Sequence, residues 1–320
     1  MARRGPAAMD GMFVREAPLI AMDKRQNDKN SSCPFCPDAL GEILVRGMDL
    51  SAKCDLLRCP LCSLVFFART YSATDYWAGA QPLVYDDEQV KIRCRQSARE
   101  RAAWLRQRVR QGNRLLDVGC GTGAFLAAAR EYGFDAIGID SSPVSAQMSA
   151  KEVGYERVLC GTLASKKLNG PFDAITMWDV IEHIPQPLAE LTAARELLSP
   201  RGLLIMLTPN QDAFFRYAAL AIYRLSGGMI RSPLSQLYYL GHYCVYSEKT
   251  MRAIMPRLGF ACVEFLRQET DVIFARKSLE KDKCSPLWVR LAACGLPLLY
   301  WLSRCLGQKN KLLAVCEKMY

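Results

Sequence analysis

The clearest pattern of apolar positions lies in the middle of the 320-residue chain. Leu115, Leu116 and Val118 form a short apolar run that is typical of a buried parallel strand, and alternate glycines follow it. Ala124–Tyr132 is then rich in alanine and ends at Gly133, which predicts a helix. A strand, a glycine turn and a helix place free backbone N–H groups at the carboxyl edge of a sheet, where α/β folds bind ligands.

The alternation of apolar runs and helical segments continues through the rest of the chain. Five further apolar runs follow the first, and segments with helical spacing, such as Gln186–Leu198 and Glu248–Leu258, separate them. Strands that alternate with helices are typical of an α/β fold with a mainly parallel sheet. The predicted strands after the first are Asp135–Ile139, Arg157–Cys160, Ala174–Met177, Gly202–Leu207 and Ala261–Leu266.

Two segments interrupt this alternation, and we predict helical insertions at residues 212–240 and 286–306. In the first, the apolar side chains of Phe214–Leu225 recur at helical spacing. In the second, Leu287–Leu306 is strongly apolar, but charged residues and a proline keep its uncharged run well short of the roughly 20 residues that span a bilayer. We therefore expect Leu287–Leu306 to be either a packed hairpin or an interfacial helix held by nearby basic residues.

The segments before the α/β region have a different character. Residues 1–32 are polar and charged without sustained periodicity, which predicts a disordered basic arm. Residues 71–98 begin with a stretch that carries three tyrosines and a tryptophan among polar residues. We expect an aromatic linker there, packed over another part of the protein.

Charge and cysteine usage narrow the choice of partners and compartment. Lys and Arg exceed Asp and Glu by 42 − 32 = 10, and this balance favours an anionic partner such as a membrane lipid or a phosphorylated substrate. No nucleic acid partner is expected, because no RNA-binding signature or arginine-rich tract accompanies the charge. Fourteen scattered cysteines and no secretory signal predict a cytoplasmic protein, with peripheral contact at the inner face of the membrane as an extension of that prediction.

Four of the cysteines have the spacing of a metal site. Cys33 and Cys36 form one CxxC pair, and Cys59 and Cys62 form a second one after twenty-two intervening residues. Two such knuckles can supply four thiolates in a tetrahedron, which is the closed geometry of structural zinc. The sequence therefore predicts a zinc ribbon over residues 33–70, with Cys54 as a substitute ligand and unligated core cysteines as the alternative interpretation.

The glycine turn after the first strand permits two kinds of nucleotide ligand. Gly119, Gly121 and Ala124 satisfy the G-x-G-x-x-A form of a dinucleotide site, so an NAD-dependent enzyme is one hypothesis. Asp117 and Gly123 favour another ligand, since a carboxylate in the turn would repel a pyrophosphate and the extra glycine lets the backbone pass close to a bulky group.

Asp140 follows the second predicted strand, where a carboxylate can bind the two hydroxyls of a ribose. Together with Asp117 and the glycines of the turn, it resembles the motifs of class I S-adenosylmethionine-dependent methyltransferases. The resemblance implies a methyltransferase domain over residues 99–320, with a Rossmann-like sheet of seven strands in the order 3-2-1-4-5-7-6 and the seventh strand antiparallel. By analogy with relatives, Lys311–Glu317 fits the seventh strand better than Asp271–Arg276.

The same resemblance implies which residues hold S-adenosylmethionine. No acid stands at the turn after the third strand, where many relatives have one for the adenine amine, so Leu163 is expected to stack on the ring while a backbone group replaces the acid. The expected cofactor-binding residues are Asp117, Gly119, Cys120, Gly121, Gly123, Asp140, Ser141, Leu163 and Trp178.

The loop after the fourth predicted strand carries the candidate catalytic residues. Asp179, Glu182 and His183 resemble a motif of methyltransferases related to ubiquinone-biosynthesis O-methyltransferases, some of which bind a divalent metal through these positions and some of which do not. His183 is the leading candidate for the base that accepts the acceptor's proton, because it is one of only two histidines and is expected at the active edge. The alternative is that His183 only hydrogen-bonds the loop backbone.

The acceptor is inferred from context. A zinc ribbon ahead of a methyltransferase domain resembles bacterial enzymes that act on sugars, polyketides or cell-envelope intermediates, so we expect methyl transfer to an O or C atom of a small-molecule, sugar or lipid-linked acceptor. Two other classes remain as hypotheses: a zinc-ribbon binding module whose methyltransferase-like domain senses the cofactor without catalysis, and the NAD-dependent enzyme.

Overall fold

The computed structural model describes residues 32–48, 54–68, 87–238, 241–270, 298 and 300–320. The predicted arm at 1–32 lies outside these residues except for its last position. The aromatic part of the predicted linker at 71–98, the candidate strand Asp271–Arg276 and most of the predicted insertion at 286–306 also lie outside them.

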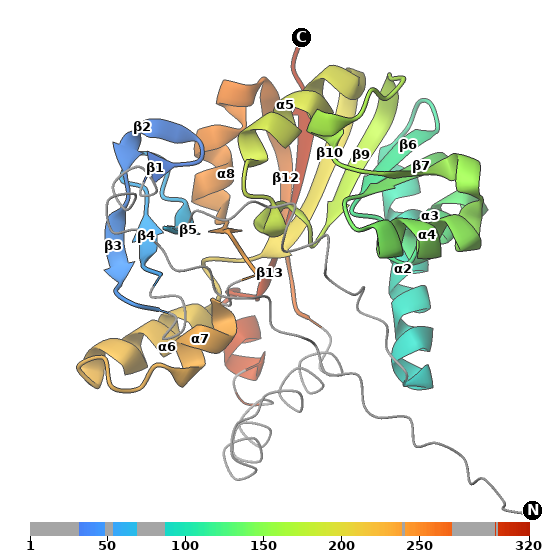
Figure 1. Cartoon of the computed structure of the whole chain (residues 1–320). Helices are drawn as coiled ribbons and strands as arrows, with labels where there is room; N and C mark the ends of the chain where they lie inside the picture. Colours follow the sequence, from blue (N-terminus) through green and yellow to red (C-terminus); the bar gives the residue numbers. More distant parts are fainter. Residues whose placement is uncertain (1–31, 49–53, 69–86, 239–240, 271–297, 299) are drawn as a thin grey trace, which may run out of the picture.

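A seven-stranded sheet forms the centre of the molecule (Figure 1). Along the sheet the strands follow the order β8-β7-β6-β9-β10-β13-β12, and β13 alone runs antiparallel to its two neighbours. Read by position in the chain, this is the predicted order 3-2-1-4-5-7-6, and the predicted seventh strand at Lys311–Glu317 is confirmed. The strands are β6 (Arg114–Val118), β7 (Asp135–Asp140), β8 (Val158–Cys160), β9 (Phe172–Trp178), β10 (Leu198–Pro209), β12 (Phe260–Gln268) and β13 (Lys311–Lys318).

Helices cover both faces of this sheet, as an α/β fold requires. On one face, α2 (Glu88–Arg108) and α3 (Ala124–Glu131) bury residues such as Leu105 and Leu126 against β6, β9 and β10. On the other face, α5 (Pro187–Leu197) and α8 (Glu248–Ile254) pack Leu191 and Met251 onto the same strands. The described part of the chain also contains α4 (Pro143–Val153), α6 (Phe214–Leu225), α7 (Ser232–Leu237), η3 (Tyr155–Arg157), η4 (Leu163–Ser165), η5 (Ile181–His183) and η6 (Pro256–Leu258), and residues 300–305 are helical.

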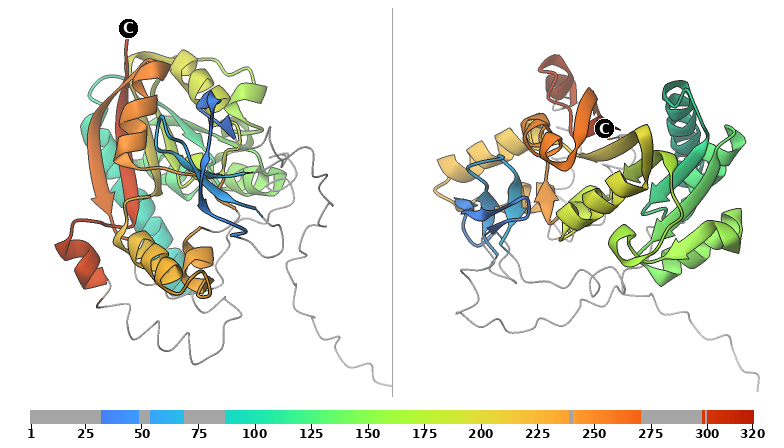
Figure 2. Two further views of the ribbon diagram at one scale, coloured as in Figure 1. Left: turned by 90° about the vertical axis from the view of Figure 1, so that its left-hand side faces the viewer. Right: turned by 90° about the horizontal axis from the view of Figure 1, so that it is seen from above.

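The N-terminal segment forms small sheets beside the central one. One sheet pairs β1 with β2, and the other has the order β11-β5-β4-β3. The strand β11 follows β10 in the α/β region and pairs with β5 of the N-terminal segment, so the two parts of the chain share a sheet. Figures 1 and 2 show the ribbon next to α8, α6 and α7, and its apolar residues belong to the same buried clusters as those of these helices. The strands are β1 (Ser32–Cys33), β2 (Cys36–Leu40), β3 (Glu42–Val45), β4 (Leu56–Arg58), β5 (Val65–Phe67) and β11 (Cys244–Val245).

Candidate functional site

The glycine turn after β6 has the backbone shape that its sequence predicts. Gly119 has φ +69°, and a Cβ at this position would lie 2.5 Å from a methyl carbon of Val180, so only glycine fits. Gly123 has φ +86°, and a Cβ there would meet Ser149 of α4. Gly123 therefore makes room for a neighbouring helix, whereas the sequence suggested that it makes room for a bulky ligand.

Asp140 ends β7 directly beside this turn. Its Oδ2 accepts a hydrogen bond from the Gly121 N–H at 2.9 Å, and its Oδ1 accepts one from the Ser142 N–H at 2.8 Å. Burial raises the pKa of Asp140, and the two N–H donors oppose that shift. Of the two serines that follow, Ser142 caps α4 by accepting from the Ser145 N–H, while Ser141 is exposed.

Asp117 lies in β6 with 2% of its surface exposed. Its Oδ1 accepts a hydrogen bond of 2.7 Å from the Thr176 hydroxyl on β9. Burial raises the pKa of Asp117 to about 7, although the Thr176 hydrogen bond and the charge of Arg101 act in the opposite direction. Cys120 also turns inward, because its thiol is buried beside Gly138, so only its backbone is available to a ligand.

Trp178 ends β9 at the same edge of the sheet. Its ring contacts Phe125 of α3 edge-on at 5.1 Å between centroids, and the guanidinium of Arg101 on α2 lies 4.8 Å from the ring centroid. The indole Nε1 is buried and finds no hydrogen-bond acceptor among the residues that the structure describes. Sequence reasoning missed Arg101, which is one of several arginines on a basic helix and carries no motif of its own.

Leu163 lies in η4, at the turn after β8, and is 3% exposed. Its backbone N–H donates to Glu190 Oε2 at 2.9 Å, and the N–H of Ala164 donates to Glu190 Oε1 at 3.3 Å. The carboxylate of Glu190 on α5 thus fixes the turn that carries Leu163. Glu190 is 27 positions away in the chain and has no motif that would have identified it.

Asp179 begins the loop after β9, and its backbone is left-handed, with φ +57°. Its carboxylate forms an ion pair with Lys311, the first residue of β13. Burial acts to raise the pKa of Asp179, but the charges of Lys311 and Arg101 outweigh it and hold the pKa below the usual value. The possible divalent metal at Asp179, Glu182 and His183 stays a prediction; in the structure the ammonium group of Lys311 lies beside the first of these three groups.

Glu182 and His183 instead lie with His242, the second histidine of the chain. Single ligand atoms of these three residues lie within 4.8 Å of one another, and the two imidazole rings are 4.8 Å apart between centroids. The sequence alone predicts no role for His242. The structure thus brings both histidines of the protein to one point.

The polar contacts in this cluster are specific. His183 Nδ1 lies 2.8 Å from the carbonyl oxygen of Gly241, and the Thr208 hydroxyl donates to Glu182 Oε2 at 2.9 Å. Burial raises the pKa of Glu182 to about 8, and the charge of Asp179 adds to this shift. Burial lowers the pKa of His183, against the hydrogen bond to Gly241. At neutral pH the carboxyl group therefore holds its proton and the imidazole is neutral.

The four predicted zinc ligands also come together. The sulfur atoms of Cys33, Cys36, Cys59 and Cys62 all lie within 4.8 Å of one another, and all four residues are buried. Cys54 is not part of this group; it is buried elsewhere in the ribbon, against Val45 and its neighbours. The spacing and burial fit a tetrahedral zinc site of four thiolates.

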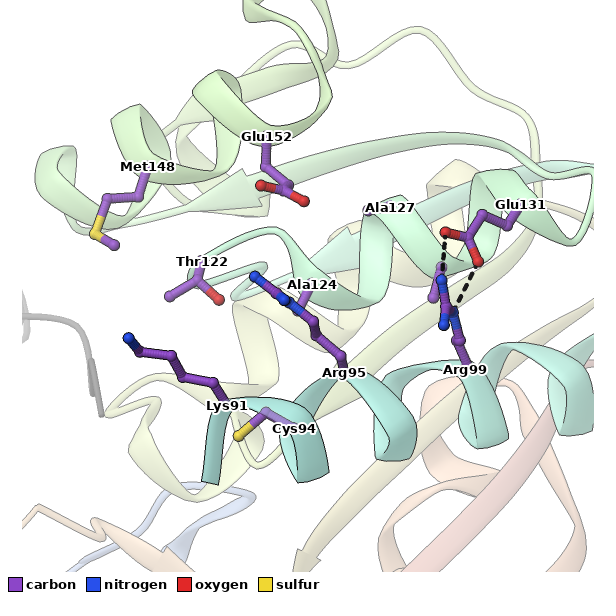
Figure 3. A pocket seen from close by; sticks show the side chains of 11 residues that line it. Lys91, Cys94, Arg95, Arg99, Thr122, Ala124, Ala127, Glu131, Met148 and Glu152 are labelled. Atoms are coloured by element: carbon purple, nitrogen blue, oxygen red, sulfur yellow. Dashed lines mark hydrogen bonds and ion pairs between the residues drawn. The ribbon is translucent and has the colours of Figure 1, made fainter. Parts of the chain in front are cut away.

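A separate groove lies in the layer of helices, between α2 and the pair α3 and α4 (Figure 3). Arg99 pairs with Glu131 along its wall, with 3.0 Å between Nε and Oε2. Thr122 of the glycine turn contributes to one end. None of the predicted cofactor residues lines this groove, so it is distinct from the edge that carries Asp140 and Trp178.

Comparison with known proteins gives a consistent picture. Residues 88–265 match the family model described as "Methyltransferase domain". A ubiquinone biosynthesis O-methyltransferase of Cereibacter sphaeroides is 37% identical over 109 residues, which are 32% of this chain and 43% of the relative. A ubiquinone biosynthesis O-methyltransferase of Xanthomonas campestris pv. campestris is 36% identical over 107 residues, which are 31% of this chain and 44% of the relative. The chain thus spans less than half the length of these relatives.

Solved structures resemble the fold at low sequence identity. A SAM-dependent methyltransferase from Archaeoglobus fulgidus has a TM-score of 0.47 and 17% identity, with 70% of this chain and 94% of that chain covered. A magnesium protoporphyrin IX methyltransferase from Synechocystis PCC 6803 with bound SAH has a TM-score of 0.46 and 15% identity, with 77% and 93% covered.

Proposed function

Because the chain belongs to the family of methyltransferase domains, which residues 88–265 match, we propose that it transfers a methyl group from S-adenosylmethionine to a hydroxyl oxygen of a small-molecule acceptor. The observation that carries this proposal is the position of Asp140 at the end of β7, beside the glycine turn. The names of the relatives favour oxygen over carbon as the acceptor atom.

Several groups at the sheet edge suit this cofactor. The Asp140 carboxylate can accept hydrogen bonds from ribose hydroxyls, and the unpartnered Trp178 Nε1 can donate to a ligand. Gly119 and Gly121 have no side chains, so a ligand can approach their backbone closely. Leu163 is the apolar residue that we propose to contact the adenine ring of the cofactor. The cofactor supplies an electrophilic methyl group on a sulfonium. Of the other predicted contacts, Asp117, Cys120, Gly123 and Ser141, only Ser141 presents an exposed side chain.

We predict that Asp140→Asn weakens S-adenosylmethionine binding about 10- to 100-fold. Replacing the carboxylate removes hydrogen bonds to a charged group, which are worth roughly 1.5–3 kcal/mol. The measurement is calorimetric titration of the full chain with S-adenosylmethionine and, in parallel, with NAD. Asp135→Asn, at the opposite end of β7, is the matched control and should bind as the wild type does. Tight NAD binding without S-adenosylmethionine binding would overturn the proposed function in favour of the NAD-dependent enzyme.

His183 is the group that we assign to proton removal. A carbonyl oxygen only accepts hydrogen bonds, so the neutral ring that contacts Gly241 carries its proton on Nδ1. Nε2 is then the basic nitrogen of the ring, and we assign to it the proton that an acceptor hydroxyl loses as the methyl group arrives. The raised pKa of Glu182, about 8, keeps its carboxyl group protonated at neutral pH, so this group does not compete for that proton. Asp179 is engaged in its ion pair with Lys311. Release of S-adenosylhomocysteine in a mass-spectrometric screen of hydroxylated acceptors separates catalysis from mere cofactor sensing.

The ribbon is proposed to hold one structural zinc ion on Cys33, Cys36, Cys59 and Cys62. Four thiolates leave no open position, so the ion would stabilise the ribbon and take no part in methyl transfer. Arg257 of η6 supports this site, since it donates to Cys36 Sγ at 3.2 Å and to the carbonyl of Phe35 at 3.1 Å. A guanidinium beside a thiolate offsets part of the negative charge of a four-thiolate centre.

We also propose that the acceptor is lipid-linked and that the protein contacts a membrane surface. The last residue of α6, Leu225, is 90% exposed, and Met229 in the turn after α6 is 85% exposed. The helical residues 300–305 expose Trp301 (59%). Phe215 of α6 contacts Tyr300 at 5.4 Å between ring centroids, so these exposed groups belong to adjoining elements. None of the helices in the described part of the chain combines the length and apolar character that a membrane span needs.

We predict that the full chain floats with vesicles that contain anionic lipid and that the double variant Leu225→Asp, Met229→Asp reduces the bound fraction at least about tenfold. Two large apolar side chains that no longer enter the lipid each cost roughly 1.5–3 kcal/mol. Leu188→Asp, an exposed leucine on α5, is the matched control. Wild-type protein that floats with neither anionic nor neutral vesicles would remove membrane contact from the proposal.

A further inference from the structure

Arg216 is an arginine in an unusual position. It lies in the first turn of α6, with only 5% of its surface exposed. The helix starts just after β10 reaches the active edge of the sheet. The Ala213 N–H donates to the carbonyl of Asn210, and the Arg216 N–H donates to the carbonyl of Ala213, so hydrogen-bonded turns lead from the strand into the helix. Arg216 is therefore placed by the same strand that carries Thr208, the partner of Glu182.

The guanidinium has little that compensates its charge. Its Cζ lies 4.3 Å from the centroid of the Tyr238 ring, and the Tyr238 hydroxyl is itself engaged with Gln211 at 2.8 Å. Within the described residues, Arg216 forms no ion pair, and its Nη1 is buried without a hydrogen-bond partner. Tyr238 stabilises the charged form of Arg216 in part, but it is not an anion. A buried charge that no anion neutralises is strongly unfavourable, so Arg216, with Nη1 unpartnered, is expected to meet an anion in the working protein.

The neighbouring ionisable groups do not neutralise it. The Glu182 carboxyl group is close enough to sense the charge of Arg216, but the two side chains form no ion pair in the described part of the chain. His242 is also close, and an imidazole cannot neutralise a cation in either protonation state. Asp179, in the loop after β9, pairs with Lys311. Arg216 thus has no anionic partner among the described residues.

We propose that Arg216 binds an oxyanion, a carboxylate or a phosphate, that the methyl acceptor carries in addition to its hydroxyl group. This inference rests on the proposed function, because it takes the space beside Glu182 and His242 as the acceptor site. The planar guanidinium can donate two parallel hydrogen bonds to either anion, which would orient the acceptor hydroxyl relative to the histidines. The acceptor class is then a hydroxylated acid rather than a neutral alcohol.

The test measures thermal unfolding of the full chain, with S-adenosylhomocysteine present and ionic strength constant, in the presence of benzoate, phenyl phosphate or chloride. We expect benzoate, phenyl phosphate or both to raise the midpoint above that in chloride, and Arg216→Met to weaken the binding of that anion at least tenfold. Arg216→Met should also unfold at or above the wild-type temperature without anion, since it removes an uncompensated buried charge. Arg224→Met, an exposed arginine two turns along α6, should behave as the wild type does.

The outcomes separate cleanly. A response to benzoate alone identifies a carboxylate, and a response to phenyl phosphate alone identifies a phosphate; both support the proposal if Arg216→Met abolishes the response. A wild-type protein that responds to neither anion, or an Arg216→Met variant that keeps the response, overturns it. If Arg216→Met does not fold, Arg216→Lys must still show weaker binding of the anion, because an ammonium cannot form the two parallel bonds. Since no methyl transfer is measured, failure here is distinguishable from loss of S-adenosylmethionine binding.

Discussion

Replacing His183 with glutamine or alanine is expected to lower kcat about 10²- to 10⁴-fold, the usual contribution of a positioned general base. The reason is the hydrogen bond from Nδ1 to Gly241, which leaves Nε2 as the acceptor of the proton. The measurement is release of S-adenosylhomocysteine with an acceptor found by screening, while calorimetry shows that the variants still bind S-adenosylmethionine. Normal turnover in both variants would disprove the assignment.

The pH dependence gives a second view of the same group. A base must be unprotonated to act, and burial holds the pKa of His183 below its ordinary value of 6.5. The rate should therefore be constant near pH 7 and fall only as the pH drops through the lowered pKa, below 6.5. His242→Gln is the informative comparison: if that variant loses the acid limb while His183→Gln keeps it, the two histidines have the opposite roles.

Removing one zinc ligand is expected to have the largest effect on stability. Cys59→Ser should reduce the zinc content from one ion per chain to nearly none and unfold the ribbon, since a tetrahedral thiolate site depends on all four ligands and its binding free energy is folding free energy. Metal analysis and thermal unfolding of the full chain measure both effects. Cys54→Ser, which replaces a buried cysteine of the same ribbon outside the sulfur cluster, should keep its zinc.

The same variant should also lose methyl transfer, although the proposed zinc ion would take no part in the chemistry. Strand β5 pairs with β11 through Phe66 and Cys244, and the N–H of Tyr243 donates to the carbonyl of Glu182 at 2.7 Å. These bonds connect the ribbon to the loop that carries His242. Turnover that survives the loss of zinc would contradict this connection, and a second metal ion in the wild type would instead indicate Glu182, His183 and His242 as ligands.

Much of the fold could be predicted from local sequence because its signals are local. A buried parallel strand is a short apolar run, and a glycine turn is visible in the sequence. The strand order and the antiparallel strand at Lys311–Glu317 came instead from the family resemblance that these local patterns carry. The four cysteines have a spacing that geometry explains. Within each strand, the glycine turn and each CxxC pair, the decisive residues are neighbours in the chain.

The parts that sequence reasoning missed depend on contacts between distant residues. Lys311 reaches Asp179, and Glu190 reaches the backbone of Leu163, although neither has a motif. Phe214–Leu225 contains two arginines, Arg216 and Arg224, and nothing in the sequence distinguishes the buried one from the exposed one. The pattern of β11 was hidden as well, because a strand of two residues has no periodicity.

The position of β13 has a consequence for how the protein is made. This strand inserts between β10 and β12, and it supplies Lys311 to Asp179, a residue 132 positions earlier. During synthesis on the ribosome, Asp179 therefore emerges long before its cation, and β12 has no neighbour in the central sheet until β13 follows. The edge of the sheet and the loop with the catalytic candidates are completed together, so translation that stops before residue 311 would yield a chain with an open sheet and an unpaired carboxylate.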